Sequence, residues 1–99
     1  MPRNIYNWGY DDVVSFLKQH FFIEVHIDSS HHYYRGNINN NDKLAHIQDH
    51  KGETINPKTL KNVIRQSGIP KIYWLKWAQA GNKIMRKKIQ FSGARPIKK

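Results

Sequence analysis

Residues 23–35, IEVHIDSSHHYYR, decide the fold because they contain two short strands joined by a tight turn. In the first six residues, apolar side chains alternate with polar ones, which is the pattern of a strand with one buried face. We expect the apolar side chains of Ile23, Val25 and Ile27 to point into the core. After the turn, a second strand is expected over residues 30–35.

Further elements lie on both sides of this stretch. A weaker third strand is expected over residues 43–50, with Ala45 and Ile47 on its inner face. The polar segment 37–42 is typical of a loop between the second and third strands. Before the first strand, residues 11–20 carry an apolar stripe at helical spacing and two acidic residues in the first turn, where the helix dipole favours negative charge.

The clearest helix follows Asn56 and ends at Ser67. Asn56 is a favourable N-cap, Pro57 suits the first helical position, and Gly68 suits the position just after the last turn. A shorter helix is expected over residues 70–79. The order α-β-β-β-α, with this added C-terminal helix, predicts an α+β two-layer sandwich in which helices cover one face of a three-stranded sheet.

The 99 residues are enough for one domain with a modest core. We expect this domain to span residues 1–81 and a basic tail to follow over residues 82–99. The chain contains no cysteine, which excludes disulfides and thiolate catalysis. Neither a signal-peptide core nor an apolar run of about 20 residues is visible, so we expect a cytoplasmic protein without membrane contact.

The formal net charge of +10 at pH 7 is unevenly distributed. Residues 54–99 contain twelve Lys or Arg and no acidic residue, whereas residues 1–53 contain five Lys or Arg and seven Asp or Glu. A C-terminal half that carries only positive charges suits a polyanionic partner, because contacts to phosphates release counterions. Nucleic acid is the expected partner, although a solvated basic face or an acidic protein partner also explains the charge.

Two blocks of the sequence resemble the HicA toxin family, whose members are also called YcfA-like proteins. The block IDSSHHYY, residues 27–34, resembles the family's Gly-Ser-His strand motif. The block HKGETINPKTLKNVIRQSGI, residues 50–69, resembles its second motif, in which a strand-ending histidine precedes a turn and a capped helix. The resemblance covers about residues 8–70, and the two blocks at this separation in a small basic chain make it specific.

The resemblance implies a fold like that of a double-stranded-RNA-binding domain. It also implies a toxin of a type II toxin–antitoxin system, an endoribonuclease that cleaves mRNA, is neutralised by a HicB antitoxin and causes growth arrest. It assigns the catalytic role to His31, which follows the motif serine Ser30, and it matches His50 to the histidine of the second block. Two positions depart from the family pattern, because Ser29 and Phe21 stand where the family has glycine.

Histidine suits this chemistry because RNA carries its own nucleophile, the 2′-hydroxyl. A base removes its proton, cations stabilise the charge on phosphorus, and an acid protonates the leaving oxygen, so no metal or other cofactor is expected. An imidazole with its ordinary pKa of about 6.5 supplies both forms near neutral pH. Alternation along the strand puts His31 and Arg35 on one face and His32 on the other, so only one of the adjacent histidines can face a given site.

The expected RNA-binding residues are the motif serine and five basic residues. Three of the basic residues share one face of the second predicted helix. The set is Ser30, Arg35, Lys51, Lys58, Lys61 and Arg65, with His50 and His32 as accessory candidates. The plain alternatives are a solvated surface for the basic residues and a structural role for the histidines.

Other functions fit the sequence less well. A metal site is disfavoured because His46 and His50, at i, i+4 spacing, lie on a predicted strand and no zinc signature is present. Trp74 and Trp77 suit helix packing better than base stacking. The alternatives to a ribonuclease are a non-catalytic RNA-binding module on the same fold and a small DNA-binding protein, and cleavage of RNA but not of DNA distinguishes them.

Overall fold

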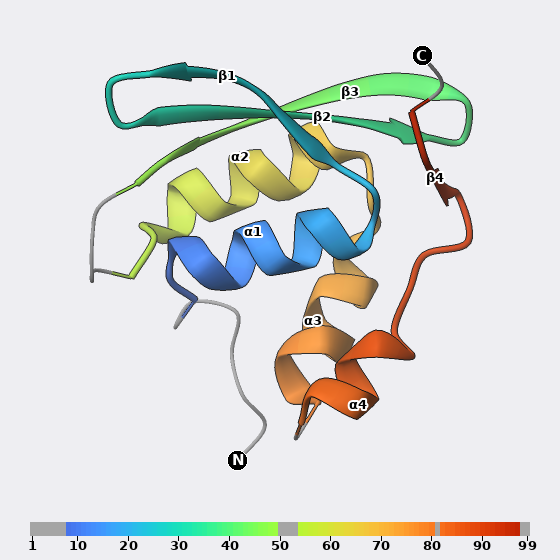
Figure 1. Ribbon diagram of the computed structural model, residues 1–99. Coiled ribbons are helices and arrows are strands. Elements are labelled where there is room, and N and C mark those ends of the chain that lie inside the picture. Colours follow the sequence, from blue (N-terminus) through green and yellow to red (C-terminus); the bar gives the residue numbers. More distant parts are fainter. Residues whose placement is uncertain (1–7, 50–53, 81, 98–99) are drawn as a thin grey trace.

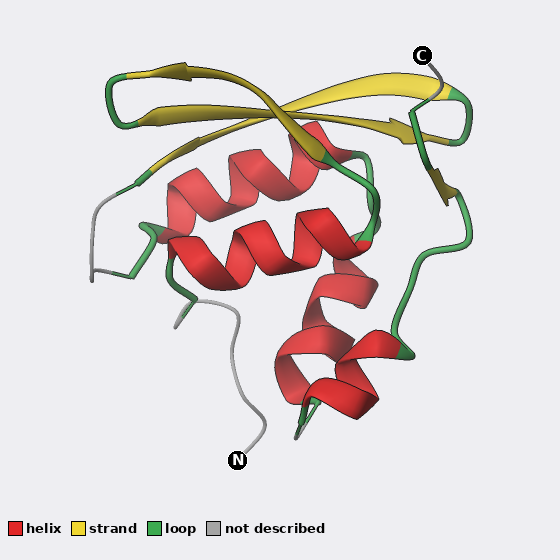
Figure 2. Ribbon diagram, in the orientation of Figure 1, coloured by secondary structure: helices red, strands yellow, loops and turns green. Residues whose placement is uncertain are grey.

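The computed structural model describes residues 8–49, 54–80 and 82–97 (Figure 1). Its elements are α1 (Tyr10–Gln19), β1 (Ile23–Asp28), β2 (His31–Ile38), β3 (Asn41–Gln48), α2 (Pro57–Ser67), α3 (Lys71–Gln79), α4 (Lys83–Lys87) and β4 (Ala94–Arg95). The strands form one antiparallel sheet in the order β1-β2-β3, and β4 pairs with β2 beyond the end of β1. Figure 2 shows α1 and α2 on one face of this sheet. The predicted α+β sandwich, with the layout of a double-stranded-RNA-binding domain, is confirmed, and α4 and β4 extend it.

The core lies between the inner face of the sheet and the helices. Ala45 and Ile47 of β3 are fully buried, as expected from the sequence. Both α1 and α2 bury one apolar face against the sheet, and the prediction of an Asn56 cap is confirmed by the bond from the Lys58 N–H to Asn56 Oδ1 at 2.9 Å. The buried helix residues are Val13, Phe16 and Leu17 of α1 and Leu60, Val63, Ile64 and Ser67 of α2. No helix in the described ranges is long and apolar enough to cross a membrane.

An aromatic cluster joins α3 to α1. Trp74 stacks on Phe16 with ring centroids 4.0 Å apart, and Trp8 contacts Trp77 edge to face at 5.0 Å. Trp74 and Trp77 are buried, so the interpretation of these residues as helix-packing side chains is confirmed. Rings in this arrangement contribute both apolar burial and favourable ring–ring electrostatics.

Asn39 and Asn40 alone form the turn between β2 and β3. Both have a positive φ, 54° and 68°, which is the requirement of a type I′ hairpin turn and one that asparagine tolerates. The expectation of a six-residue loop over residues 37–42 is wrong, because the strands continue up to this two-residue turn. The turn fixes the register, in which Tyr33 lies opposite His46.

β1 is more exposed than its sequence predicts. Ile23, Val25 and Ile27 are 47%, 46% and 53% exposed, so the expectation that they point into the core is wrong. A β-bulge at Val25 shifts the register, and β1 lies at the edge of the sheet. Ile23 consequently lies opposite Arg35, and Ile27 lies opposite His32 on the other face.

Residues 82–97 contact both α1 and β2. The side-chain amide of Gln19 donates to the carbonyls of Arg86 and Ile89, each at 2.8 Å. The Asn39 N–H donates to the Gly93 carbonyl at 2.9 Å. These bonds tie the polypeptide after α4 to the helix layer at one point and to the β2–β3 turn at another.

His20 is completely buried between α1 and this C-terminal segment. Its Nδ1 donates to the Phe16 carbonyl at 2.9 Å, and its Nε2 accepts the Phe91 N–H at 3.0 Å. Because Nε2 accepts a hydrogen bond, the ring is neutral and carries its proton on Nδ1. Burial lowers the pKa of His20 below its usual value, and the bond to Phe16 opposes this shift only in part.

We expect the free energy of unfolding to decrease as the pH falls below about 6.5, the ordinary pKa of histidine. The folded-state pKa of His20 is lowered, so in this range the unfolded chain binds more protons and acid favours unfolding. Urea denaturation at a series of pH values measures the dependence. His20→Gln, whose side chain still donates and accepts, should show a weaker dependence on pH, and an equally steep one would contradict this role.

The end of α1 places Phe21 in the left-handed region, at φ 68°. The Phe22 N–H donates to the Leu17 carbonyl and the Phe21 N–H to the Lys18 carbonyl, each at 3.0 Å. This is the hydrogen-bond pattern of a Schellman motif, in which glycine usually takes the left-handed position because it lacks a Cβ atom. Phe21 is thus strained, at the position where the resemblance noted in the sequence implies glycine.

Phe21→Gly should be more stable than Phe21→Ala by about 1 kcal/mol, because both variants lose the ring but only glycine removes the Cβ atom from a left-handed residue. For a domain of this size the difference corresponds to about 4–8 °C in Tm, measurable by circular dichroism. The comparison with Phe21→Ala is needed because the ring is only 38% exposed and its removal also forfeits apolar burial. Equal Tm values for the two variants would show that the left-handed backbone at this position carries no strain.

Candidate active site on the outer face of the sheet

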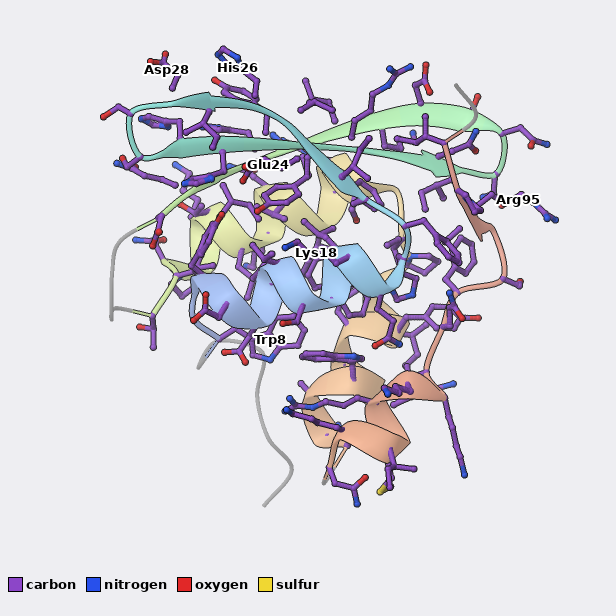
Figure 3. The ribbon with its side chains drawn as sticks, viewed as in Figure 1. Trp8, Lys18, Glu24, His26, Asp28 and Arg95 are labelled. Atoms are coloured by element: carbon purple, nitrogen blue, oxygen red, sulfur yellow. The ribbon has the colours of Figure 1, made fainter. Side chains whose placement is uncertain are left out.

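His31 lies on the outer face of the sheet, opposite the face covered by the helices. Alternation along β2 places Tyr33 on the same face, and the register adds His46 of β3. Figure 3 shows the side chain of His26 projecting from β1 away from the helices, whereas Glu24 projects toward them. The sheet therefore gathers three histidines and a tyrosine on its outer face.

A hydrogen bond joins the imidazoles of His31 and His46. His31 Nδ1 lies 2.7 Å from His46 Nε2, and the ring centroids are 4.9 Å apart with an interplanar angle of 20°. The centroid distance exceeds the distance between the two nitrogens by about the sum of the two ring radii. The two rings therefore meet edge to edge and lie in nearly the same plane. Nδ1 of His31 is thereby occupied, and Nε2 is the nitrogen left for a substrate.

His46 is itself held in place by its neighbours. Its ring lies parallel to that of Tyr33, with centroids 4.7 Å apart and an interplanar angle of 18°. Its backbone N–H donates to Gln66 Oε1 of α2 at 3.0 Å. Burial lowers the pKa of His46, and the charge of His31 lowers it further. The neutral form of His46 is favoured, and this suits a ring that orients His31.

His32 belongs to a separate network on the inner face. Its Nδ1 lies 2.8 Å from Glu24 Oε2, and the Tyr34 hydroxyl donates to the same oxygen at 3.1 Å. The bond to His32 holds the pKa of Glu24 below its usual value, and burial raises the pKa of Tyr34. The Tyr10 hydroxyl of α1 lies 2.9 Å from that of Tyr34. The network ties β1 and β2 to α1, and it does not bring His32 together with His31.

The turn before β2 positions the motif serine. Ser29 has a φ of 58°, a left-handed conformation that explains why glycine suits this position. Ser30 Oγ accepts a hydrogen bond from Gln48 Nε2 of β3 at 3.3 Å, and the Ser30 carbonyl accepts the Asp49 N–H at 2.8 Å. Ser30 thus closes the end of the sheet beside His31.

The basic residues expected to bind RNA do not share one surface. Arg35 lies on the outer face of β2 and pairs with Asp42 at 3.0 Å. Lys58, Lys61 and Arg65 lie on the exposed side of α2, whose buried side faces the sheet, so the structure does not bring them together with His31. His50 and Lys51 lie outside the described residues.

The pairing of His31 with His46 is the part of the site that the sequence alone does not identify. In the sequence, His46 stands out only by its spacing of four residues from His50, which is a spacing of metal ligands. Among the described residues, no three His, Cys, Asp or Glu side chains lie close enough together to hold a metal ion. The two asparagines at 39 and 40 carry the missing signal, because a two-residue turn at these positions places residue 46 opposite residue 33.

The model of the family described as HicA toxin of bacterial toxin-antitoxin matches residues 10–69, more than half of the chain and the segment from α1 through α2. No curated protein and no solved structure matches the chain. The matched residues include both His31 and His46.

We expect the pKa of His46 to rise toward its usual value in a His31→Ala variant, because the positive charge that lowers it is removed. Burial, the larger cause, remains, so the rise should be partial. NMR titration of the imidazole resonances measures it. His26→Ala is the control, since His26 contacts Tyr33 at a centroid distance of 5.4 Å without a bond to His46. A His46 pKa that His31→Ala leaves unchanged would rule out the pairing in solution.

Proposed function

The chain belongs to the HicA toxin family of bacterial toxin–antitoxin systems, and we propose that its toxic activity is the metal-independent cleavage of mRNA at His31. The observation that carries the proposal is the 2.7 Å bond between His31 Nδ1 and His46 Nε2, which reserves the other nitrogen of His31 for the substrate. General acid–base catalysis needs a base that another group holds in the right orientation, and here His46 holds His31.

In the proposed reaction, the substrate supplies the nucleophile. His31 Nε2 takes the proton of a ribose 2′-hydroxyl, the 2′-oxygen bonds to the adjacent phosphorus, and the bond from phosphorus to the 5′-oxygen of the next nucleotide breaks. An acid protonates that leaving oxygen, giving a 2′,3′-cyclic phosphate and a 5′-hydroxyl. In its protonated form the same imidazole is suited to the acid step. A positioned base or acid of this kind contributes about 10²- to 10⁴-fold.

His46 acts through His31 in this scheme and is a positioning residue. Its lowered pKa keeps it neutral, so it can accept a hydrogen bond from Nδ1 when His31 has taken up a proton. The parallel ring of Tyr33 and the bond to Gln66 restrict its movement. A preorganised acceptor avoids reorganisation when the imidazolium forms.

The cations of α2 have a different role in the proposal. Lys58, Lys61 and Arg65 lie in the helix layer, and we assign them to the electrostatic attraction of RNA away from the reacting phosphate. The net charge of +10 supports this attraction. Lys51 and His50 stay candidates for RNA contacts on the strength of the sequence alone.

Membership of the family implies an antitoxin partner. We propose that this partner is of the HicB type and that it covers the outer face of the sheet around His31. Covering a site that attracts a polyanion favours an acidic surface, because complementary charge speeds association and fixes the orientation of the complex.

Incubation of the protein with single-stranded RNA and with DNA of the same sequence, both in EDTA, tests the proposal. RNA should be cut and DNA left intact, because DNA lacks the 2′-hydroxyl. His31→Ala should lose about 10²-fold or more of the rate. The cleavage rate of His46→Ala should lie between that of the wild type and that of His31→Ala. The pH profile of cleavage should also shift, since this substitution changes only the orientation and the protonation of His31.

The opposite outcome has a clear meaning. If the wild-type protein and His31→Ala both bind RNA in a salt-sensitive way and neither cuts it, the chain is a non-catalytic RNA-binding module on the same fold. If His31→Ala cuts as fast as the wild type, the assignment of His31 is wrong.

A further inference from the structure

The outer face of β2 continues well beyond His31. Alternate residues of the strand place His31, Tyr33, Arg35 and Asn37 in one row on this face. With the usual rise per residue of a strand, the row is about 20 Å long. β4 then adds Arg95, which lies directly opposite Asn37. Figure 3 shows Arg95 near the end of the sheet opposite to Asp28, the residue that precedes the β1–β2 turn.

A hollow of about 630 Å³ lies at this far end of the row. Its lining residues are the basic Arg35 and Arg95, the polar Asn37 and Asn40, the acidic Asp42, and the apolar Pro96 and Ile97. Residues from β2, from the β2–β3 turn and from the C-terminal segment meet here. The hollow therefore exists only because β4 pairs with β2 past the end of β1.

The charged groups of the hollow suit a phosphate. Arg35 pairs with Asp42 at 3.0 Å, but their side chains are 48% and 66% exposed, and an ion pair this exposed is weak. Arg95 adds a second guanidinium group, so cations outnumber the single carboxylate. Guanidinium groups bind phosphate oxygens through two parallel hydrogen bonds.

Asn37 adds a second, independent indication of a ligand. Asn37 lines the hollow, and its Oδ1, which has almost no solvent-exposed surface, has no hydrogen-bond partner in the part of the chain that the structure describes. Buried polar atoms almost always have partners, and one left without a partner costs about 1–3 kcal/mol. A nucleotide supplies hydrogen-bond donors, from its ribose hydroxyl and base, next to its phosphate.

From these observations we infer that the hollow is a second RNA subsite, which binds a nucleotide of the substrate strand at a distance from the cleaved bond. The inference rests on the proposed function for the identity of the ligand. The RNA strand lies along β2, with the reacting phosphate at His31 and a further phosphate at Arg95. A dinucleotide that occupies His31 is too short to reach the hollow, whereas a longer single strand reaches both.

The length of the substrate provides the first test. Arg95→Gln and Asn37→Leu should raise the KM for a longer single-stranded RNA by about tenfold, because each removes a hydrogen bond to the nucleotide in the hollow. Cleavage of a dinucleotide should not change in either variant. Lys71→Gln is the control for the lost charge, since Lys71 lies on α3 and does not line the hollow.

Binding measured without cleavage provides the second test. In the His31→Ala background, Arg95→Gln should weaken binding of the same labelled RNA and lower the slope of log K against log salt by about 0.7, as expected for one lost phosphate contact on a single strand. Asn37→Leu should weaken binding while leaving the Tm equal or higher, because it removes a buried atom that lacks a partner. A purely structural role for Asn37 predicts a lower Tm.

The outcomes separate the subsite from the catalytic proposal. If the wild type does not cut RNA but both variants weaken binding as described, the subsite stands and the catalytic role of His31 fails. If the wild type cuts RNA and both variants match Lys71→Gln on the longer strand, the subsite is excluded. Equal losses on the dinucleotide and the longer RNA would also overturn it, because they indicate damage to the site at His31.

Discussion

The two-residue turn at Asn39 and Asn40 sets the register of β2 against β3, and the rest of the structure depends on that register. Side chains alternate between the faces of a sheet, so a slip of one residue would exchange the two faces of β3. The observed register buries Ala45 and Ile47 and in the same step places His46 beside His31. The apolar core and the histidine pair are thus fixed by one constraint. The burial of the core enforces the register on which the site relies.

Local backbone strain accompanies this arrangement. Among the residues that the structure describes, four non-glycine residues have a positive φ, and the two asparagines of the β2–β3 turn tolerate it best. Phe21 and Ser29 also have the left-handed conformation, but their side chains tolerate it less well. These two residues flank β1, whose residues are all exposed. The stability of β1 therefore comes from its pairing with β2 and from the Glu24 network, and little of it comes from apolar burial.

The sequence predicts the elements whose causes are local. The N-cap at Asn56, the left-handed Gly68 and the spacing of apolar residues specify α2 without reference to the rest of the chain. The bulge at Val25 is not local, since it becomes visible only against the register of β2. The pairing of His31 with His46 joins residues 15 positions apart, and the hollow at Arg95 depends on a strand of two residues. Patterns of composition and period carry no signal for such contacts, and the histidine pairing follows from the sequence only once Asn39 and Asn40 are recognised as a two-residue turn.

The position of the C-terminal segment depends on His20, a buried residue outside the candidate active site. The family match ends at residue 69, yet β4 extends the sheet that carries His31. His20, inside the matched range, accepts the Phe91 N–H only as a neutral ring, and Phe91 precedes β4 by a short turn. A charged His20 would have a proton on Nε2 facing that N–H, which opposes the docking of the segment. The placement of Arg95 at the far end of the sheet therefore depends on the burial of the His20 imidazole at the C-terminal end of α1, because burial favours the uncharged ring.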